Sequence, residues 1–155
     1  MGEHVVDAVT VAPRLTAVVA QTTTWERFPA LWRELLDEVY DFVRKREELA
    51  PTAGPGPKWQ NVMLYKDDAP AVEVGVLVGR SFSPEGRVIA SRLPGGKAAM
   101  TIHRGDYAGL GRAHEAVHQF AEERERELAG PRWEIYGHVH SDASEIEIEV
   151  YYLLT

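Results

Sequence analysis

Carboxylates next to aromatic residues recur late in this 155-residue sequence and are its strongest candidates for chemistry. Glu134 lies between Trp133 and Tyr136, and Glu149 stands two residues before Tyr151. Aromatic rings offer flat apolar contact area, and each cation held over a ring face contributes about 0.5–2 kcal/mol. A carboxylate among such rings is partly desolvated and can serve as a counter-ion or as a proton donor. These residues suit a flat, hydrophobic and often cationic small molecule.

Strand alternation predicts that these residues share one face of a sheet. Alternate residues of a strand point to opposite faces, so Glu134 and Tyr136 share one side of a strand expected at 133–139. Glu149 and Tyr151 likewise share one side of the next strand. The opposite sides are rich in valine and isoleucine, and we expect those sides to face helices. The expected members of the uncovered face are Met63, Tyr65, Glu134, Tyr136, Glu149 and Tyr151, with Trp59 at the edge of a loop.

The elements that position these residues occur twice in the same order. Residues 5–78 and 88–153 each follow the order of a strand, a turn with proline, a strand, a long helix and two strands. Helical spacing of apolar residues predicts helices over 28–46 and 107–128. The expected strands are 5–11, 15–22, 61–66, 72–78, 88–93, 98–103, 133–139 and 146–153.

This repeat predicts an α+β fold made of a duplicated ββαββ-type module. Two long helices are expected on one face of a largely antiparallel sheet. The length is typical of one compact domain, here residues 1–155, with half-modules at about 5–79 and 87–154. Small ligands often bind between such modules, so we expect a ligand groove at the pseudo-twofold that relates the two halves.

Composition narrows the functional classes. The formal net charge is −7, and the sequence has no basic run that would neutralise phosphates, so we expect no direct contact with nucleic acid. The acidity favours cationic ligands or serves solubility. There is no cysteine, no apolar stretch of membrane-spanning length and no secretory leader after Met1. We therefore expect a cytoplasmic protein without a membrane partner.

Histidine spacing raises the question of a metal site, and the sequence argues against it. His114 and His118 stand four residues apart on the second expected helix, a spacing that can bind metal. No third helical ligand accompanies them, and His118 lies about 100° from the apolar stripe, so it should face water. His138 and His140 approach an expected hairpin turn. We expect neither a metal ion nor another cofactor.

Three motifs in the second half resemble the GyrI-like small-molecule-binding domain, which also forms the effector-binding half of many AraC- and MerR-type bacterial regulators. The motifs are Leu93–Ala99, His103–Leu110 and Trp133–Tyr136, followed by an end at Tyr151–Leu154. They cover residues 88–155, and the first half fits through the internal repeat. The resemblance implies duplicated modules of the SHS2 type, two helices on a curved antiparallel sheet, and a ligand groove at the pseudo-twofold.

The resemblance also implies a function. It predicts broad binding of lipophilic, often cationic compounds on aromatic residues around a buried glutamate, and by motif position that residue is Glu134, with Tyr136 beside it. Because no DNA-binding segment accompanies the motifs, we expect a stand-alone form that senses or sequesters drugs or toxins, with a protein partner (a regulator or DNA gyrase) as an open option. One alternative is a hydrolase of cyclopropanoid DNA-alkylating natural products, and a weaker one is an inhibitor of DNA gyrase.

The expected roles in the site fall on a small set of residues. If the protein is an enzyme, Glu134 is the expected general acid or base and Tyr136 its catalytic neighbour. The sequence leaves open whether the proline-rich segment 50–58, next to Trp59, covers the groove. The expected ligand-binding residues are Glu134, Tyr136, Tyr65, Trp59, Met63, Tyr151 and Glu149.

Overall fold

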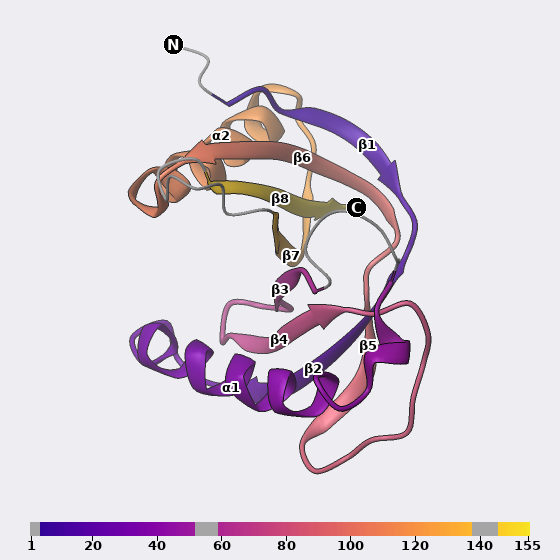
Figure 1. Cartoon of the computed structure of the whole chain (residues 1–155). Helices are drawn as coiled ribbons and strands as arrows, with labels where there is room; N and C mark the ends of the chain where they lie inside the picture. The colour runs from indigo at the N-terminus through magenta and orange to yellow at the C-terminus, as the bar shows by residue number, and fades with distance from the viewer. Residues whose placement is uncertain (1–3, 52–58, 138–145) are drawn as a thin grey trace.

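The computed structural model describes residues 4–51, 59–137 and 146–155, and its elements follow the expected order (Figure 1). The first half-module contains β1 (Asp7–Val11), β2 (Arg14–Thr22), α1 (Phe28–Val43), the short 3₁₀ helix η1 (Glu47–Leu49), β3 (Asn61–Tyr65) and β4 (Ala71–Leu77). The second contains β5 (Val88–Leu93), β6 (Gly96–Gly105), η2 (Tyr107–Gly109), α2 (Leu110–Glu123), β7 (Leu128–Tyr136) and β8 (Ile146–Leu154). The predicted α+β fold with a duplicated ββαββ module is confirmed.

The strands form one curved antiparallel sheet with a symmetric order. That order is β1-β6-β8-β7-β3-β4-β2-β5, and it reads the same from both ends when each strand of one half-module is exchanged for its counterpart. The pseudo-twofold therefore passes between β3 and β7, where Met63 pairs with Glu134. Because β1 pairs with β6 and β5 pairs with β2, each half of the sheet takes its outer strand from the other half-module.

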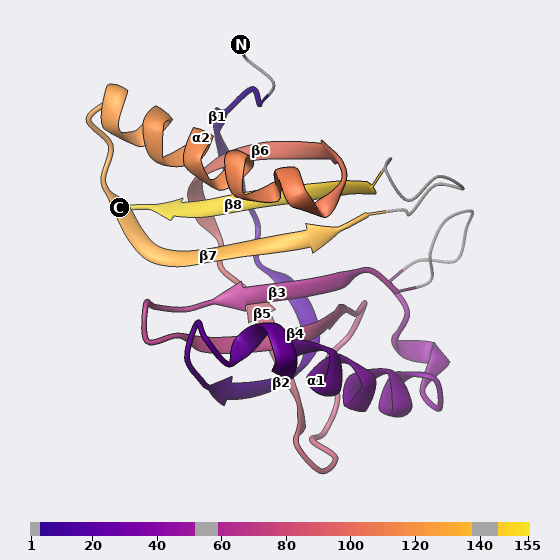
Figure 2. The ribbon, with the colours of Figure 1, turned by 90° about the vertical axis from the view of Figure 1, so that its left-hand side faces the viewer.

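Both helices lie on the same face of this sheet (Figure 2). Helix α1 begins at Phe28 with Pro29 in its first turn, where a missing N–H costs nothing, and packs on β2 and β4. Its buried residues recur at intervals of three, four and seven positions, which place them on one helix face. They are Phe28, Leu35, Leu36, Val39, Phe42 and Val43. Within the described ranges, no helix combines the length and apolar character that a membrane span requires.

The opposite face of the sheet carries a second apolar core. The rings of Trp133 and Tyr151 stack there, 5.3 Å apart and nearly parallel. Ile135 and Leu64 belong to the same buried cluster. The helices thus cover one face of the sheet, and on the other face the side chains of the strands pack against one another.

Helix α2 is shorter than the sequence predicts. It ends at Glu123 rather than at 128, Glu125 takes a left-handed backbone conformation with φ of 52°, and Leu128 is the first residue of β7. Leu128 pairs with Leu154 of β8. Strand pairing therefore overrides the helix propensity of the charged run before Leu128, because the pairing satisfies backbone groups that a longer helix would leave on an exposed end.

Candidate functional site

A groove of about 700 Å³ lies between the two helices, above the central strands β3 and β7. This volume is typical of sites for small organic molecules. Because β3 and β7 flank the pseudo-twofold, both half-modules contribute to its wall. The groove is lined by Phe28, Pro29, Trp32, Arg33, Asn61, Met63, Tyr65, Tyr107, Leu110, Glu134 and Tyr136.

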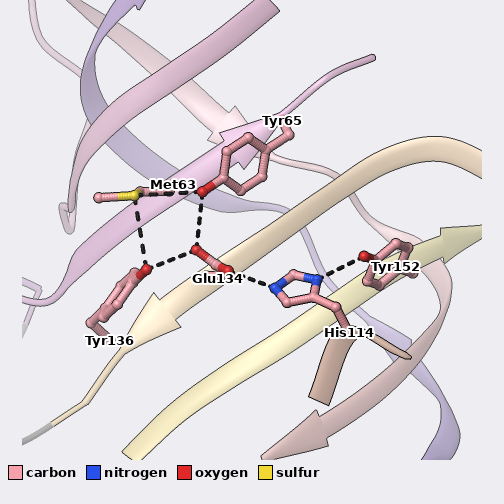
Figure 3. Close-up of polar contacts among 6 residues, drawn as sticks. All are labelled: Met63, Tyr65, His114, Glu134, Tyr136 and Tyr152. Atoms are coloured by element: carbon pink, nitrogen blue, oxygen red, sulfur yellow. Dashed lines mark hydrogen bonds and ion pairs between the residues drawn. The ribbon is translucent and has the colours of Figure 1, made fainter. Parts of the chain in front are cut away.

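Glu134 is the buried carboxylate of the groove, with 3% of its surface exposed. Oε1 accepts hydrogen bonds from the hydroxyls of Tyr65 (3.2 Å) and Tyr136 (2.8 Å) (Figure 3). Oε2 lies 2.7 Å from Nε2 of His114. Three polar partners surround this carboxylate, which is how proteins stabilise a charge held away from water.

His114 links the carboxylate to helix α2. Its Nδ1 lies 2.7 Å from the hydroxyl of Tyr152 on β8, so the imidazole bridges Glu134 and Tyr152 (Figure 3). The side chain of His114 is 23% exposed, whereas that of Glu134 is almost fully buried. The helical spacing of His114 and His118 indicated only a possible metal ligand, and this role of His114 was not predicted. The available signal was its position four residues after Leu110, which lines the groove.

The tyrosines around Glu134 keep their protons. Burial, followed by the charge of Glu134, raises the pKa of both Tyr65 and Tyr136 far above the ordinary value. Burial likewise raises the pKa of Tyr152 to about 12, although Arg132 acts in the opposite direction. At neutral pH these side chains are phenols, and Tyr65 and Tyr136 act as hydrogen-bond donors to Glu134.

Further aromatic rings extend the two ends of the site. Trp25 contacts Tyr65 at 5.4 Å between ring centroids, and Tyr107 contacts Tyr136 at 6.4 Å. Trp25 and Tyr107 are among the few large apolar side chains that are exposed, at 46% and 57%. Phe28 meets Tyr65 edge-on at 5.5 Å. The groove therefore combines a buried acid with rings that partly face solvent.

The expected position of these residues on the sheet is wrong in one respect. Glu134, Tyr136, Met63 and Tyr65 lie on the face that carries the helices, between α1 and α2, and not on an uncovered face. Trp133 and Ile135, expected under the helices, belong to the core on the opposite face. The reason is that the polar side of β7, with Glu134 and Tyr136, faces the groove between the helices and not bulk solvent, so side-chain polarity did not identify the side on which the helices pack.

Glu149 and Tyr151 lie away from the groove. Glu149 pairs with Ile135 across β7 and β8, so it shares the face opposite to Glu134. The Tyr151 hydroxyl donates to Oε1 of Glu149 at 2.5 Å, and the Tyr151 ring stacks on Trp133. The expectation that all the carboxylate and aromatic pairs share one face is therefore wrong for these two residues.

Two further expectations concern the loop before β3 and the histidines. Trp59 is half-buried and packs against the core under α1, outside the groove lining. Most of the proline-rich segment (52–58), whose relation to the groove the sequence left open, lies outside the described residues, as do His138 and His140. Among the described residues, no three side chains of the metal-binding types lie close enough to hold an ion. His118 is exposed, as the sequence predicts.

Comparison with known proteins places the chain in a family. The sequence matches the GyrI-like small molecule binding domain over residues 4–154. A comparison with curated proteins gives no match.

Solved structures with the same fold come from three proteins in particular. The C-terminal domain of EcmrR is 18% identical with a TM-score of 0.75, covering 98% of each chain. In the EcmrR–DNA complex (18% identity, TM-score 0.77, 99% of this chain), this chain spans only 58% of EcmrR. SAV2435 bound to tetraphenylphosphonium is 9% identical with a TM-score of 0.64, covering 97% of this chain and 93% of that one. A hydrolase from Listeria innocua is 13% identical with a TM-score of 0.60, covering 97% and 91%. At these identities the likeness concerns the fold alone.

Proposed function

Because this chain belongs to the GyrI-like small-molecule binding domain family, we propose that it binds hydrophobic, cationic small molecules in the groove between α1 and α2. The observation that carries this proposal is Glu134, a buried carboxylate at the wall of an aromatic groove. The rings supply apolar area and cation–π attraction, and the carboxylate supplies the opposite charge.

Electrostatics favour a cation in this groove although Arg33 also lines it. Arg33 is exposed and its guanidinium lies 5.3 Å from the centre of the Trp32 ring, so water screens its charge. Glu134 is buried, and a charge in a region of lower dielectric acts more strongly. At an effective dielectric of 20, a cation about 5 Å away gains on the order of 3 kcal/mol before its own desolvation is counted.

Two ions of nearly the same shape and opposite charge test this proposal. Tetraphenylphosphonium, the ligand in the SAV2435 structure, is compared with tetraphenylborate by quenching of tryptophan fluorescence, since Trp32 lines the groove. We expect the protein to prefer the phosphonium ion, and Glu134→Gln to weaken that ion while sparing or strengthening the borate. Glu149→Gln, on the opposite face, is the matched control and should leave the ratio unchanged. Equal affinities for the two ions in the unchanged protein would exclude a cation-selective site.

The biological use of such binding is sensing or sequestration. In EcmrR the similar domain is part of a longer protein that forms a complex with DNA. For this chain, a protein partner, action as a stand-alone module and a cytoplasmic location stay predictions. Inhibition of DNA gyrase also stays a prediction, and a supercoiling assay tests it.

A second candidate function is hydrolysis of electrophilic, cyclopropanoid-type compounds. The observation that favours it is the set of proton-bearing groups within hydrogen-bond distance of Glu134, namely Tyr65, Tyr136 and His114. General acid–base catalysis requires a positioned side chain that can give or accept a proton, and a carboxyl group held by its neighbours meets this requirement. Binding and hydrolysis would use the same groove, so product analysis by mass spectrometry distinguishes them.

A further inference from the structure

The pseudo-twofold makes the two ends of the groove comparable residue by residue. Met63 and Glu134 face each other at its centre, and the tyrosines Tyr65 and Tyr136 each follow two residues later. The symmetry therefore preserves the tyrosines and replaces the carboxylate by a thioether in the first half-module.

The helices show the same break in symmetry. Phe28 and Leu110 are the first residues of α1 and α2, and both line the groove. Four residues later, α1 carries Trp32 and α2 carries His114. The second half-module thus replaces a Trp–Met combination with a His–Glu pair, and the two changes occur at side chains that touch each other.

The hydrogen bonds of Glu134 distinguish its groove side from the side on which His114 lies. The partners of Oε1 of Glu134, Tyr65 and Tyr136, line the groove, whereas the partner of Oε2, His114, is not among the lining residues. A carboxylate has no hydrogen to give, so Nε2 of His114 must carry one. In the tautomer with its only ring hydrogen on Nε2, Nδ1 accepts a hydrogen bond from the Tyr152 hydroxyl, which is a phenol at neutral pH.

We propose that His114 is a positioning residue that determines the charge selectivity of the groove. By donating from Nε2 to Oε2, it fixes the orientation of the Glu134 carboxylate with Oε1 turned toward the ligand, and Tyr152 selects the required tautomer. The ligand is then a molecule with one cationic centre next to Glu134 and an apolar body against Phe28 and Trp32. This inference rests on the proposed function of the groove, and its test separates the two.

The test uses two substitutions that differ in one donor. In His114→Gln the side-chain amide can place an N–H near the position of Nε2, whereas His114→Leu removes the donor and keeps an apolar side chain of moderate size. We expect His114→Leu to weaken tetraphenylphosphonium about tenfold, because the hydrogen bond to a charged group is lost, while tetraphenylborate binds as before or more tightly. His114→Gln should restore most of the selectivity. Circular dichroism and thermal unfolding confirm that both variants fold.

The outcomes are distinguishable. An unchanged phosphonium-to-borate ratio in His114→Leu, or an equal loss of both ions, would overturn the role of His114, because a merely structural residue behaves in these ways. Failure of the unchanged protein to bind tetraphenylphosphonium would instead contradict the proposed function. In that case the ¹⁵N shifts of the His114 ring still decide the positioning role. A hydrogen on Nε2 that shifts to a mixture of tautomers in Tyr152→Phe supports it, and a hydrogen on Nδ1 alone contradicts it.

Discussion

The hydroxyl of Tyr65 donates a hydrogen bond of 3.2 Å to Oε1 of Glu134, and this bond crosses the pseudo-twofold between β3 and β7. Tyr65 belongs to the first half-module and Glu134 to the second. Neither half alone can complete the site, because the acid comes from one half-module and one of its three hydrogen-bond partners, Tyr65, comes from the other. The duplication therefore supplies the two walls of the groove, and the break in its symmetry supplies the charge.

Removal of a tyrosine hydroxyl should lower stability measurably. Tyr65→Phe and Tyr136→Phe each delete a hydroxyl that donates to the buried Glu134, and each should lower the free energy of unfolding by about 1–2 kcal/mol. The two losses should not add, since both donors share one acceptor oxygen. Urea denaturation of the single and double variants measures this coupling. Tyr107→Phe, at a residue that is 57% exposed, serves as the control and should change stability by less than about 0.5 kcal/mol.

Alkaline pH should destabilise the protein through Tyr152. An unfolded tyrosine loses its proton near pH 10, whereas the folded chain holds the proton of Tyr152 to about 12. Between these values the unfolded state binds fewer protons, so the free energy of unfolding falls by about 1.4 kcal/mol per pH unit for this group. The contribution is fully present below pH 10 and is lost as the pH rises through 12. Tyr152→Phe should flatten the decline in denaturation curves measured over this window, and an identical slope in both proteins would contradict the assignment.

Truncation of Trp32 should reduce the affinity for cationic and anionic ligands to the same extent. The ring lines the groove and offers apolar area to any ligand body. Trp32→Ala should therefore weaken tetraphenylphosphonium and tetraphenylborate alike, by about tenfold, in calorimetric titrations that do not depend on tryptophan emission. Phe82→Ala is a useful comparison, because Phe82 packs against Phe42 in the core under α1 and outside the groove. Selective loss of one ion only in Trp32→Ala would show that the ring acts through charge.

Glu134→Gln distinguishes hydrolysis from binding. If the groove hydrolyses cyclopropane-bearing alkylators, loss of the acid–base group should reduce turnover by about 10²- to 10⁴-fold, as followed by mass spectrometry of the product. His114→Gln is the companion variant, since it keeps a donor to the carboxylate. Product formation that survives Glu134→Gln would mean that Glu134 has no acid–base role, and quenching of fluorescence without any product would leave the protein a binding module.

Several features of the site follow from local patterns. Glu134 and Tyr136 stand two residues apart in one strand, so their common face was predictable from backbone geometry alone. The apolar stripe of α1 likewise predicted its buried side. The prediction that Glu149 and Glu134 share a face was wrong because these residues belong to different strands. The register that pairs Glu149 with Ile135 cannot be predicted from the sequence of either strand alone. The predicted end of α2 was wrong for a similar reason, because the pairing of Leu128 with Leu154 joins segments that are distant in the sequence.

By itself, the sequence determined the two ββαββ modules, the helix and strand periods, and the family that the motifs indicate, because these depend on neighbours within a few residues. Only the tertiary structure decided that Glu134 lies under the gap between the helices, that Tyr65 reaches it across the symmetry axis, and that His114 stands behind it. These relationships join residues from separate strands and from α2. They arise when the sheet register and the packing of the helix are satisfied together, and no local pattern contains that information.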